Sequence, residues 1–486
     1  MISIKKNFLY NSILTISGYL FPLITYPYVS RVLGVTNIGI CNFIDSIINY
    51  FILFSMMGIT AVGMREISQH RDHREELSSH FFSLLSLNLI TTIIAIIALI
   101  VSIHVVPVLY PYKDLLYTGV CKLFFNFFMI EWFYSGVEDF KYITQRSILV
   151  RCIYVFLIFL FIQSSADYKL YYFLTASIYI INGTINIIYC RKYIKFYTLK
   201  NIHIQPYIKP FFTIGFYILI TNIYTSLNIT WLGFVSEVEE VGYYTTATKI
   251  HAIILAFFTA MTNVVFPRVT YLYAKGDKKE FWEKIKNVVE IVFAIAIPLV
   301  ILISIFSPNI IHLISGDGYE GAYTPLRIIA LLILILGYSQ VLVTQILMTI
   351  KQDKKLLLNS CFGACIGLLL NILLVNRFGA LGAAFVWLLS EIAISIGAQF
   401  WVTKFTNFHF PWKLFSKYIT AYIPLTIILL AIYLYCNYAD FPILCIATSL
   451  IIIYSLIIQM TFLKNPICVH YINKFISYTI RIIYTK

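Results

Sequence analysis

The sequence predicts an all-α polytopic membrane protein with fourteen transmembrane helices, arranged as two six-helix bundles related by an internal repeat plus two extra C-terminal helices. Three observations predict this fold class. Hydrophobic residues make up 60% of the 486 residues and charged residues only 12%, against about 25% charged residues in soluble domains. Long apolar segments recur along the whole chain. Lysine and arginine are concentrated in alternate connections between them.

Each apolar segment has about 20 residues or more, which is enough to cross about 30 Å of hydrocarbon as a helix. The segments lie at residues 8–30, 38–63, 79–106, 115–136, 142–164, 169–190, 208–234, 242–265, 286–307, 323–349, 356–376, 380–403, 417–437 and 441–463. Lys5 and Lys6 precede the first segment, and no small-residue cleavage site follows it. We therefore expect a retained helix and not a signal peptide.

The distribution of basic residues supports this helix count. With a cytoplasmic N-terminus, the inside connections and tails hold most of the 36 lysines and arginines. The outside connections hold four of them, namely Arg31, Lys113, Lys169 and Arg377. A missed helix would invert every later connection, so the bias predicts that both termini are cytoplasmic. The net charge of +14 then reflects topology and contact with anionic membrane lipid, and it does not indicate a nucleic-acid partner.

Two landmarks suggest that a unit of about six segments is duplicated. Gly39 corresponds to Gly242, and Arg65 corresponds to Arg268 at the same separation. The predicted domains are therefore an N-terminal bundle at 1–207, a C-terminal bundle at 208–410, and residues 411–486 with two more helices. The basic, amphipathic end of the last domain is expected to lie on the inner membrane surface.

Signatures of catalysis and of metal binding are absent from the sequence. The nine cysteines are scattered, odd in number and never spaced as CxxC, so we expect no disulfide and no metal site. No Walker motif, GxSxG elbow or HExxH helix occurs. The outside connections are all short, which excludes a large extracytoplasmic catalytic loop. We expect a protein that is not an enzyme and needs no cofactor.

Several stretches resemble one known family. They are NFLYNSILTISGYLFPLITYPYVSRVLGVTNIGICNFIDSII, MREISQHRDHREEL, EWFYSGVEDFKYITQRSILVR, EEVGYYTTATKI and VVFPRVTYLYAKGDKKEF. With these stretches the chain resembles the polysaccharide-unit flippases (O-antigen, or Wzx-type, transporters) of the multidrug/oligosaccharidyl-lipid/polysaccharide exporter superfamily. The resemblance covers essentially the whole sequence.

The resemblance implies a V-shaped pair of six-helix bundles with an alternating-access cavity in the bacterial inner membrane. It implies movement of an undecaprenyl-pyrophosphate-linked oligosaccharide from the cytoplasmic to the outer leaflet, for O-antigen or capsule synthesis. A coupling proton or sodium ion, the membrane lipid and the polysaccharide polymerase machinery are the partners that this function implies.

Ionisable residues within apolar segments are the candidate site residues, because a charge at the bilayer centre costs about 2.5–3.5 kcal/mol on insertion scales. The cations expected to hold a pyrophosphate and sugar are Lys122, Lys249, Arg146, Arg151, Arg327 and Arg31. The alternative for each is that it pairs with a carboxylate between helices or extends to an interface. The sequence leaves both interpretations open.

The carboxylates Asp45, Glu131 and Glu391 are candidates for the coupling ion, since a desolvated carboxylate can titrate during transport. An ion pair with a lysine such as Lys122 would instead make the carboxylate structural. Four polar residues and one proline of the first two segments are expected to line a cavity, and they are Asn11, Thr15, Asn42, Asn49 and Pro22. Close helix packing is the alternative for this polar stripe.

Other classes of protein fit less well. A cation-coupled multidrug exporter of the same superfamily should prefer an acidic cavity, and the excess of cations argues against it. A membrane glycosyltransferase or polysaccharide polymerase should carry a large outer loop, which is missing here. A peptidoglycan-precursor flippase shares the expected fold and chemistry, so charge does not exclude it.

Overall fold

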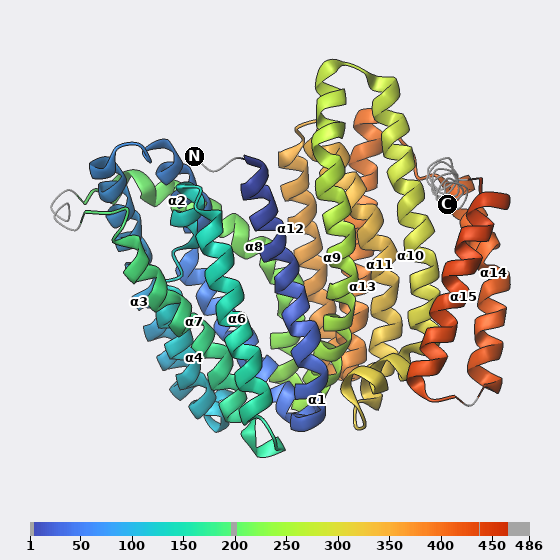
Figure 1. Cartoon of the computed structure of the whole chain (residues 1–486), viewed down its shortest axis with the longest axis horizontal. Helices are drawn as coiled ribbons and strands as arrows, with labels where there is room; N and C mark the ends of the chain where they lie inside the picture. The colour runs from blue at the N-terminus through green and yellow to red at the C-terminus, as the bar shows by residue number, and fades with distance from the viewer. Residues whose placement is uncertain (1–3, 196–201, 437, 465–486) are drawn as a thin grey trace, which may run out of the picture. The chain divides into compact units, whose positions relative to one another are not determined.

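The structure is a computed structural model that describes residues 4–195, 202–436 and 438–464 (Figure 1). Within these ranges every regular element is a helix, so the predicted all-α class is confirmed. Ten helical stretches among the described residues are long and apolar enough to cross a membrane. Two of them have 61 and 54 residues, far more than the roughly 20 that one crossing requires. The count of fourteen helices therefore stays a prediction.

A glycine bends the first of these long stretches. Helix α1 spans Ile4–Met56, and Gly34 within it has φ 75° and ψ 169°, a conformation that is essentially restricted to glycine. This bend lies in the predicted connection between the first two apolar segments. Pro22, also within α1, lacks the N–H that a regular helix would use, which favours a bend there too.

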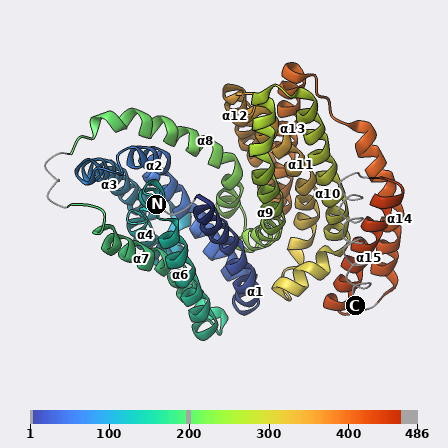
Figure 2. The same ribbon diagram turned by 45° about the horizontal axis from the view of Figure 1, so that its top comes forward.

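Contacts divide the chain into two compact units, Met1–Thr245 and Thr246–Lys486. The other helices of the first unit are α2 (Ile59–Gln69), α3 (Arg74–Val105), η1 (Pro107–Tyr112), α4 (Lys113–Asn126), α5 (Glu131–Gly136), α6 (Phe140–Phe161), η2 (Ser165–Asp167), α7 (Tyr168–Cys190) and α8 (Gln205–Val235). Helix α4 packs on α7, and α6 packs on α1 and α7. Figure 2 shows α8 as a long arc, and it contacts α1 and α2. By contacts α8 therefore belongs with the first unit, while the predicted boundaries at 207 and 410 stay predictions.

The boundary between the units falls within α9 (Val238–Lys275). The second unit continues with α10 (Lys278–Ser315), η4 (Glu320–Ala322), α11 (Tyr323–Gln340), the π-helix η5 (Val341–Met348), α12 (Asp353–Leu370), the π-helix η6 (Asn371–Val375), α13 (Asn376–Thr406), α14 (Trp412–Tyr435) and α15 (Asp440–Thr461). Gly379 has φ 53° and ψ −130° and breaks the stretch where the sequence predicts a connection. Helices α14 and α15 pack on α10 (Figures 1 and 2). The predicted surface-lying tail falls outside the described residues from 465 onward.

A buried aromatic cluster fixes the short helix α5 in the first unit. The Phe81 ring of α3 lies 5.8 Å from the Trp132 ring and 4.9 Å from the Phe133 ring of α5, centre to centre. All three side chains are buried. The sequence predicts one helix at 115–136, but residues 127–130 are not α-helical and α5 is a separate turn. This packing holds Glu131, the first residue of α5, at a defined position.

Two glycines form a close helix crossing within the first unit. A Cβ atom on Gly242 of α9 would lie 2.5 Å from the Val35 carbonyl oxygen, and one on Gly39 of α1 would lie 3.1 Å from the Gly242 nitrogen. On either side of this crossing, Thr36 donates to Glu239 at 2.8 Å and Asn42 donates to Thr245 at 2.9 Å, both pairs being 203 positions apart. Gly39 and Gly242 have that same separation. Corresponding positions of the predicted repeat therefore meet, as residues do beside a two-fold axis, although the repeat itself stays a prediction.

We expect Gly242→Ala to destabilise the protein, because its methyl group would meet a main-chain oxygen that cannot rotate away. The expected loss is about 1–3 kcal/mol, measured as a lower melting temperature of the purified protein in detergent. Gly18→Ala is the matched control, since a Cβ there would meet only the Arg151 guanidinium at 3.9 Å. Equal melting temperatures of the two variants would show that the crossing tolerates a side chain.

Candidate functional site

An ion pair joins α1 to α4 in the interior of the first unit. The Lys122 ammonium lies 2.5 Å from Asp45 Oδ1, and the two side chains are 4% and 35% exposed. The Tyr179 ring centre lies 4.8 Å from the same ammonium, and Asn49 Nδ2 donates to Asp45 Oδ2 at 3.2 Å. The lysine is thus enclosed and neutralised, while its carboxylate partner keeps an open edge.

A second ion pair joins α6 to α5. Arg146 donates to Glu131 Oε1 and to Asn186 Oδ1, and the Tyr142 hydroxyl donates to the same Asn186 oxygen at 3.1 Å. The Arg146 side chain is 3% exposed, whereas Glu131 is 42% exposed. This pair repeats the pattern of the first one, with an enclosed cation and a partly open carboxylate.

Arg151 differs from both of these cations. Its Nη1 donates to the Ser17 hydroxyl at 2.5 Å and to the Leu14 carbonyl oxygen at 3.3 Å. These acceptors are neutral, and the ion pairs found among the described residues do not include Arg151. It stands eleven residues into α6, or about 16 Å along the helix at about 1.5 Å per residue. Arg151 therefore carries a positive charge, deep within an apolar helix, that a direct carboxylate partner does not neutralise.

These groups leave the interior of the first unit with a surplus of positive charge. Three cations, Lys122, Arg146 and Arg151, stand against two carboxylates, Asp45 and Glu131. Exposing the open carboxylate edges and the surplus charge to lipid would cost several kcal/mol. The surface formed by these charged groups is therefore more stable against water or a polar ligand than against hydrocarbon.

The polar stripe of α1 lies next to Arg151. A Cβ on Gly18 would be 3.9 Å from the Arg151 guanidinium nitrogens, and the neighbouring stripe residues Asn11, Thr15 and Pro22 are exposed. The Thr15 hydroxyl bonds back to the Asn11 carbonyl oxygen at 2.9 Å, a bond that tends to bend helices. The exposed part of the predicted stripe thus continues the polar face around Arg151.

The asparagines of the second segment are divided between two roles. Asn42 donates to Thr245 at the glycine crossing, which is the packing alternative for this residue. Asn49 is exposed and bonds Asp45, so it lies on the polar face.

A cleft of about 770 Å³ opens beside the Arg146 pair. The Tyr142 and Tyr189 rings in its wall stack with centres 3.7 Å apart and planes at 7°. The hydroxyls of Tyr189 and Tyr193 donate to Asp139 Oδ2 at 2.9 and 2.6 Å. Since Tyr142 also bonds Asn186, which accepts from Arg146, the cleft adjoins the charged interior. Charged residues line the cleft as well, so it offers tyrosine rings beside charged and hydrogen-bonding groups.

The second unit contains Glu391 in a buried polar cluster. Glu391 of α13 is 5% exposed, accepts a hydrogen bond from Trp387 one turn earlier, and is in none of the ion pairs found among the described residues. The His251 ring of α9 lies edge-on to the Trp387 ring, 5.0 Å between centres. Both nitrogens of the buried His251 ring lack hydrogen-bond partners among the described residues. Buried polar atoms without partners are costly, so water or an ion is suited to this cluster.

Other predicted residues lie apart from these groups. Arg327 is exposed and donates to Ser307 at 2.8 Å. Lys249 is half-buried on α9 and Arg31 is exposed on α1. Four of the six predicted cations, Arg31, Lys122, Arg146 and Arg151, belong to the first unit, and the last three bond polar groups of neighbouring helices.

Sequence reasoning missed three residues of this interior: Ser17, Tyr179 and Asn186. Asn186 had a usable signal, because Asn182 and Asn186 stand four residues apart in an otherwise apolar helix. Tyr179 is one of 37 tyrosines, and nothing in the sequence distinguishes it. Ser17 is a common residue in membrane helices, and only the fold brings it to Arg151.

Two family models match the chain. The model described as polysaccharide biosynthesis protein matches residues 4–272, and the MatE model matches residues 214–373.

Curated proteins and a solved structure are also similar to the chain. A putative O-antigen transporter of Escherichia coli (strain K12) is 25% identical over 406 residues, which cover 81% of this chain and 95% of that protein. A probable low-salt glycan biosynthesis flippase of Haloferax volcanii is 24% identical over 39% of this chain and 40% of its own length. The solved structure of the lipid II flippase MurJ in an inward closed conformation has a TM-score of 0.76 at 16% identity, covering 94% of this chain and 100% of that one. The likeness to MurJ shows the fold. These relatives are named as transporters and flippases and not as enzymes, in agreement with the sequence analysis.

The pairing of Lys122 with Asp45 predicts an asymmetric effect of substitution. Asp45→Asn leaves an enclosed ammonium without its counter-ion, whereas Lys122→Met leaves a carboxylate that is 35% exposed and can be solvated. We expect Asp45→Asn to lower the melting temperature more, and the double variant to recover part of the loss. The coupling free energy should be about 0.5–3 kcal/mol.

The surface pair Lys169 and Asp114, 55% and 61% exposed, is the control for this cycle, because exposed pairs contribute about 0–1 kcal/mol. Equal coupling energies for the two pairs would contradict the assignment of a stabilising interior ion pair.

Proposed function

Because the matching family model covers more than half of its residues, the chain belongs to the polysaccharide biosynthesis protein family, and we propose that it is a secondary-active flippase for lipid-linked oligosaccharides. Its cargo is an undecaprenyl-pyrophosphate-linked repeat unit, moved across the bacterial inner membrane for O-antigen or capsule synthesis. The names of the curated relatives and the MurJ-like fold support this proposal.

The surplus charge on Arg151 is the observation that carries the proposal. A pyrophosphate is an anion, and a guanidinium binds phosphate oxygens through paired hydrogen bonds. Lys122 and Arg146 already hold Asp45 and Glu131, so we assign them to positioning α1, α4, α5 and α6. Of the three cations Lys122, Arg146 and Arg151, Arg151 is the one with charge left for a ligand.

The aromatic cleft supports an oligosaccharide as the part of the substrate next to the pyrophosphate. Tyr142 borders the cleft and also contacts Arg146, whose guanidinium lies 5.6 Å from its ring centre. We place the sugars against the tyrosine faces and the pyrophosphate toward Arg151. Lys249, Arg327 and Arg31 remain proposed cavity cations, without a direct observation that favours them.

Glu391 is our proposed site for the coupling proton or sodium ion. Asp45 and Glu131 each hold a cation between helices, so releasing them would break a structural contact. Glu391 is buried, and the Trp387 side chain that donates to it contacts the His251 ring, whose nitrogens have no hydrogen-bond partner among the described residues. A buried carboxylate in a polar cluster, with no cation to hold, is the better candidate for reversible ion binding.

We also propose the fourteen-helix organisation with both termini cytoplasmic. The two longest stretches, Leu9–Gln69 and Asp353–Thr406, each make two crossings, separated by the bends at Gly34 and Gly379. The broken helix α4–α5 and the long α8 each supply one more crossing. The meeting of residues 203 positions apart supports the duplication of the bundles.

The peptidoglycan-precursor flippase is the second candidate, because the MurJ structure has the same fold and its named cargo is lipid II. A multidrug exporter for cations is disfavoured by the surplus positive charge around Arg151.

The test is transbilayer movement of an undecaprenyl-pyrophosphate-linked oligosaccharide in proteoliposomes, read by leaflet accessibility. Wild type should move this lipid, and Arg151→Gln should slow it at least about tenfold, which corresponds to about 1.4 kcal/mol of lost interaction. Arg151→Lys should keep part of the rate, since it retains the charge but not the paired donors.

Arg268→Gln is the matched control, because Arg268 is 57% exposed and pairs with Glu280. If wild type moves lipid II but not the oligosaccharide lipid, the second candidate replaces the first. Full activity of folded Arg151→Gln would remove Arg151 from the site and leave the flippase proposal standing.

Glu391→Gln should abolish acceleration of transport by an imposed proton or sodium gradient while leaving slow, undriven exchange of the lipid intact. Glu320→Gln, an exposed carboxylate in η4, is the control. Gradient-driven transport that persists in Glu391→Gln would assign the coupling ion to another residue.

A further inference from the structure

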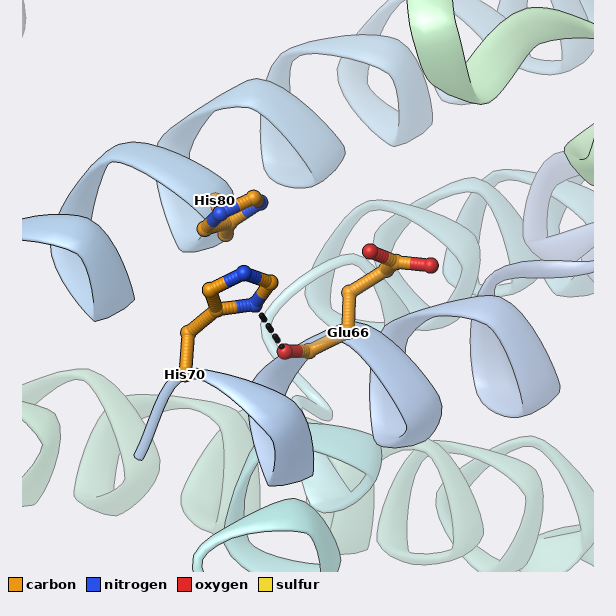
Figure 3. Close-up of side chains that lie close together, drawn as sticks. All are labelled: Glu66, His70 and His80. Carbon is orange, nitrogen blue, oxygen red and sulfur yellow. Dashed lines mark hydrogen bonds between the residues drawn. The ribbon is translucent and has the colours of Figure 1, made fainter. Parts of the chain in front are cut away.

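Three side chains with metal-binding atoms converge where α2 ends and α3 begins. Glu66 and His70 stand four residues apart on α2, hence on one face of it, and His80 of α3 lies over the His70 ring (Figure 3). Their ligand atoms all lie within 4.8 Å of one another, and each residue is half-buried. We call these residues the Glu66–His80 cluster.

The hydrogen bonds of the cluster leave one ligand atom available on each side chain. The Nδ1 atom of His70 bonds the Glu66 carbonyl oxygen at 2.9 Å, and the Nδ1 atom of His80 bonds the Tyr207 hydroxyl. Arg65 donates to Glu66 Oε1 through Nε at 3.0 Å and Nη2 at 2.9 Å. Among the described residues, no hydrogen bond was found to the Nε2 atoms of the two histidines or to the second oxygen of Glu66.

This arrangement is the one that metal sites use around their ligands. A histidine that binds a metal through one nitrogen has its other nitrogen held by a carbonyl or another polar group, and a ligating carboxylate is hydrogen-bonded in turn. Here the Glu66 carbonyl, Tyr207 and Arg65 provide those outer contacts. The two imidazole rings also stack, 3.8 Å apart between centres and 24° between planes.

We propose that the Glu66–His80 cluster binds one divalent transition-metal ion of the Zn²⁺ type. The ligands are a Glu66 oxygen and the Nε2 atoms of His70 and His80, with the remaining position open to water. Two imidazoles and one carboxylate form a donor set that zinc sites use. The cysteine spacing predicts no metal site, and a single Glu-x-x-x-His pair with a third ligand ten residues later matches no recognised motif.

Ion binding requires a small rearrangement. Zinc bonds of about 2.0–2.1 Å in tetrahedral geometry place donor atoms about 3.3 Å apart, whereas ligand atoms of the cluster are up to 4.8 Å apart, so they must approach one another. The rings must also leave their stack, since the ion lies in the plane of each ring that binds it. His70 is the C-cap residue of α2, so its ring can turn without breaking a helical hydrogen bond.

The bound ion would link the end of α2 to α3, and the Tyr207 hydrogen bond would connect both to α8. Glu66 and His70 belong to α2 and His80 belongs to α3, and Tyr207 of α8 holds His80 from the other side. In the predicted topology this is the cytoplasmic end of the first unit. The proposal does not rest on the flippase function, and binding is measured without transport.

The test uses the full-length protein, purified in detergent, stripped of metal and freed of any affinity tag. Co²⁺ is the probe, because its visible absorption reports nitrogen and oxygen ligation, and Zn²⁺ should displace it. Wild type should bind one equivalent, and Zn²⁺ should raise its melting temperature. Glu66→Gln, His70→Ala and His80→Ala should each weaken Co²⁺ binding by more than about tenfold. Tyr207→Phe keeps all three ligands and should weaken it by about 10–100-fold.

His73→Ala and His409→Ala are the matched controls, since both histidines are exposed and lie outside the cluster; they should bind Co²⁺ like wild type. Folding of each variant is checked by size-exclusion chromatography. Absence of stoichiometric binding by folded wild type overturns the proposal. Binding that survives His70→Ala or His80→Ala also overturns the proposal, because the ion would then lie elsewhere. Loss of binding in His73→Ala would overturn it for the same reason. Loss of binding in Tyr207→Phe with an unchanged fold supports the outer contact.

Discussion

The cost of a charge in hydrocarbon is the constraint on which the first unit depends. Lys122 and Arg146 are enclosed only because Asp45 and Glu131 approach them from other helices. Those contacts fix α1 against α4, and α6 against α5. The same ion pairs therefore neutralise the cations and hold the helices in place. The aromatic cluster around Phe81 holds α5 and thereby Glu131. Apolar packing and charge pairing thus act on the same short helix.

In this bundle, cations that pair with a carboxylate have a structural role, whereas a cation without such a partner is a candidate for ligand binding. A cation that holds a carboxylate has little attraction left for an anion that enters later, whereas the hydrogen bonds of Arg151 within the described part of the chain go to a hydroxyl and a carbonyl oxygen. Buried charge alone is therefore a poor guide to a binding site in a membrane protein. The balance of charges within a bundle is more informative, since a surplus of one sign needs water or a ligand to be stable.

The parts of the fold that follow from local sequence could be predicted. Apolar length located helices at every predicted segment, and the expected breaks coincide with Gly34 and Gly379, where the backbone angles require glycine. Pairing was beyond prediction, because Lys122 and Asp45 are 77 positions apart and several other carboxylates were equally plausible partners. The break at residues 127–130 was also missed, because its residues are mostly apolar and carry no glycine or proline. Asn186 was overlooked although its spacing from Asn182 resembled that of polar residues that were recognised.

The contact between Gly39 and Gly242 has a consequence for how this chain can change over generations. If the halves arose by gene duplication, the ancestor was a homodimer in which one glycine met its own copy, and a single substitution altered both sides of the contact at once. After fusion the two positions mutate separately, yet a side chain at either one would still meet main-chain atoms, those of Val238 at Gly39 and those of Val35 at Gly242. A larger residue on one side therefore has no compensating change available on the other. The pair is expected to remain small on both sides even where the rest of the two halves has diverged beyond recognition.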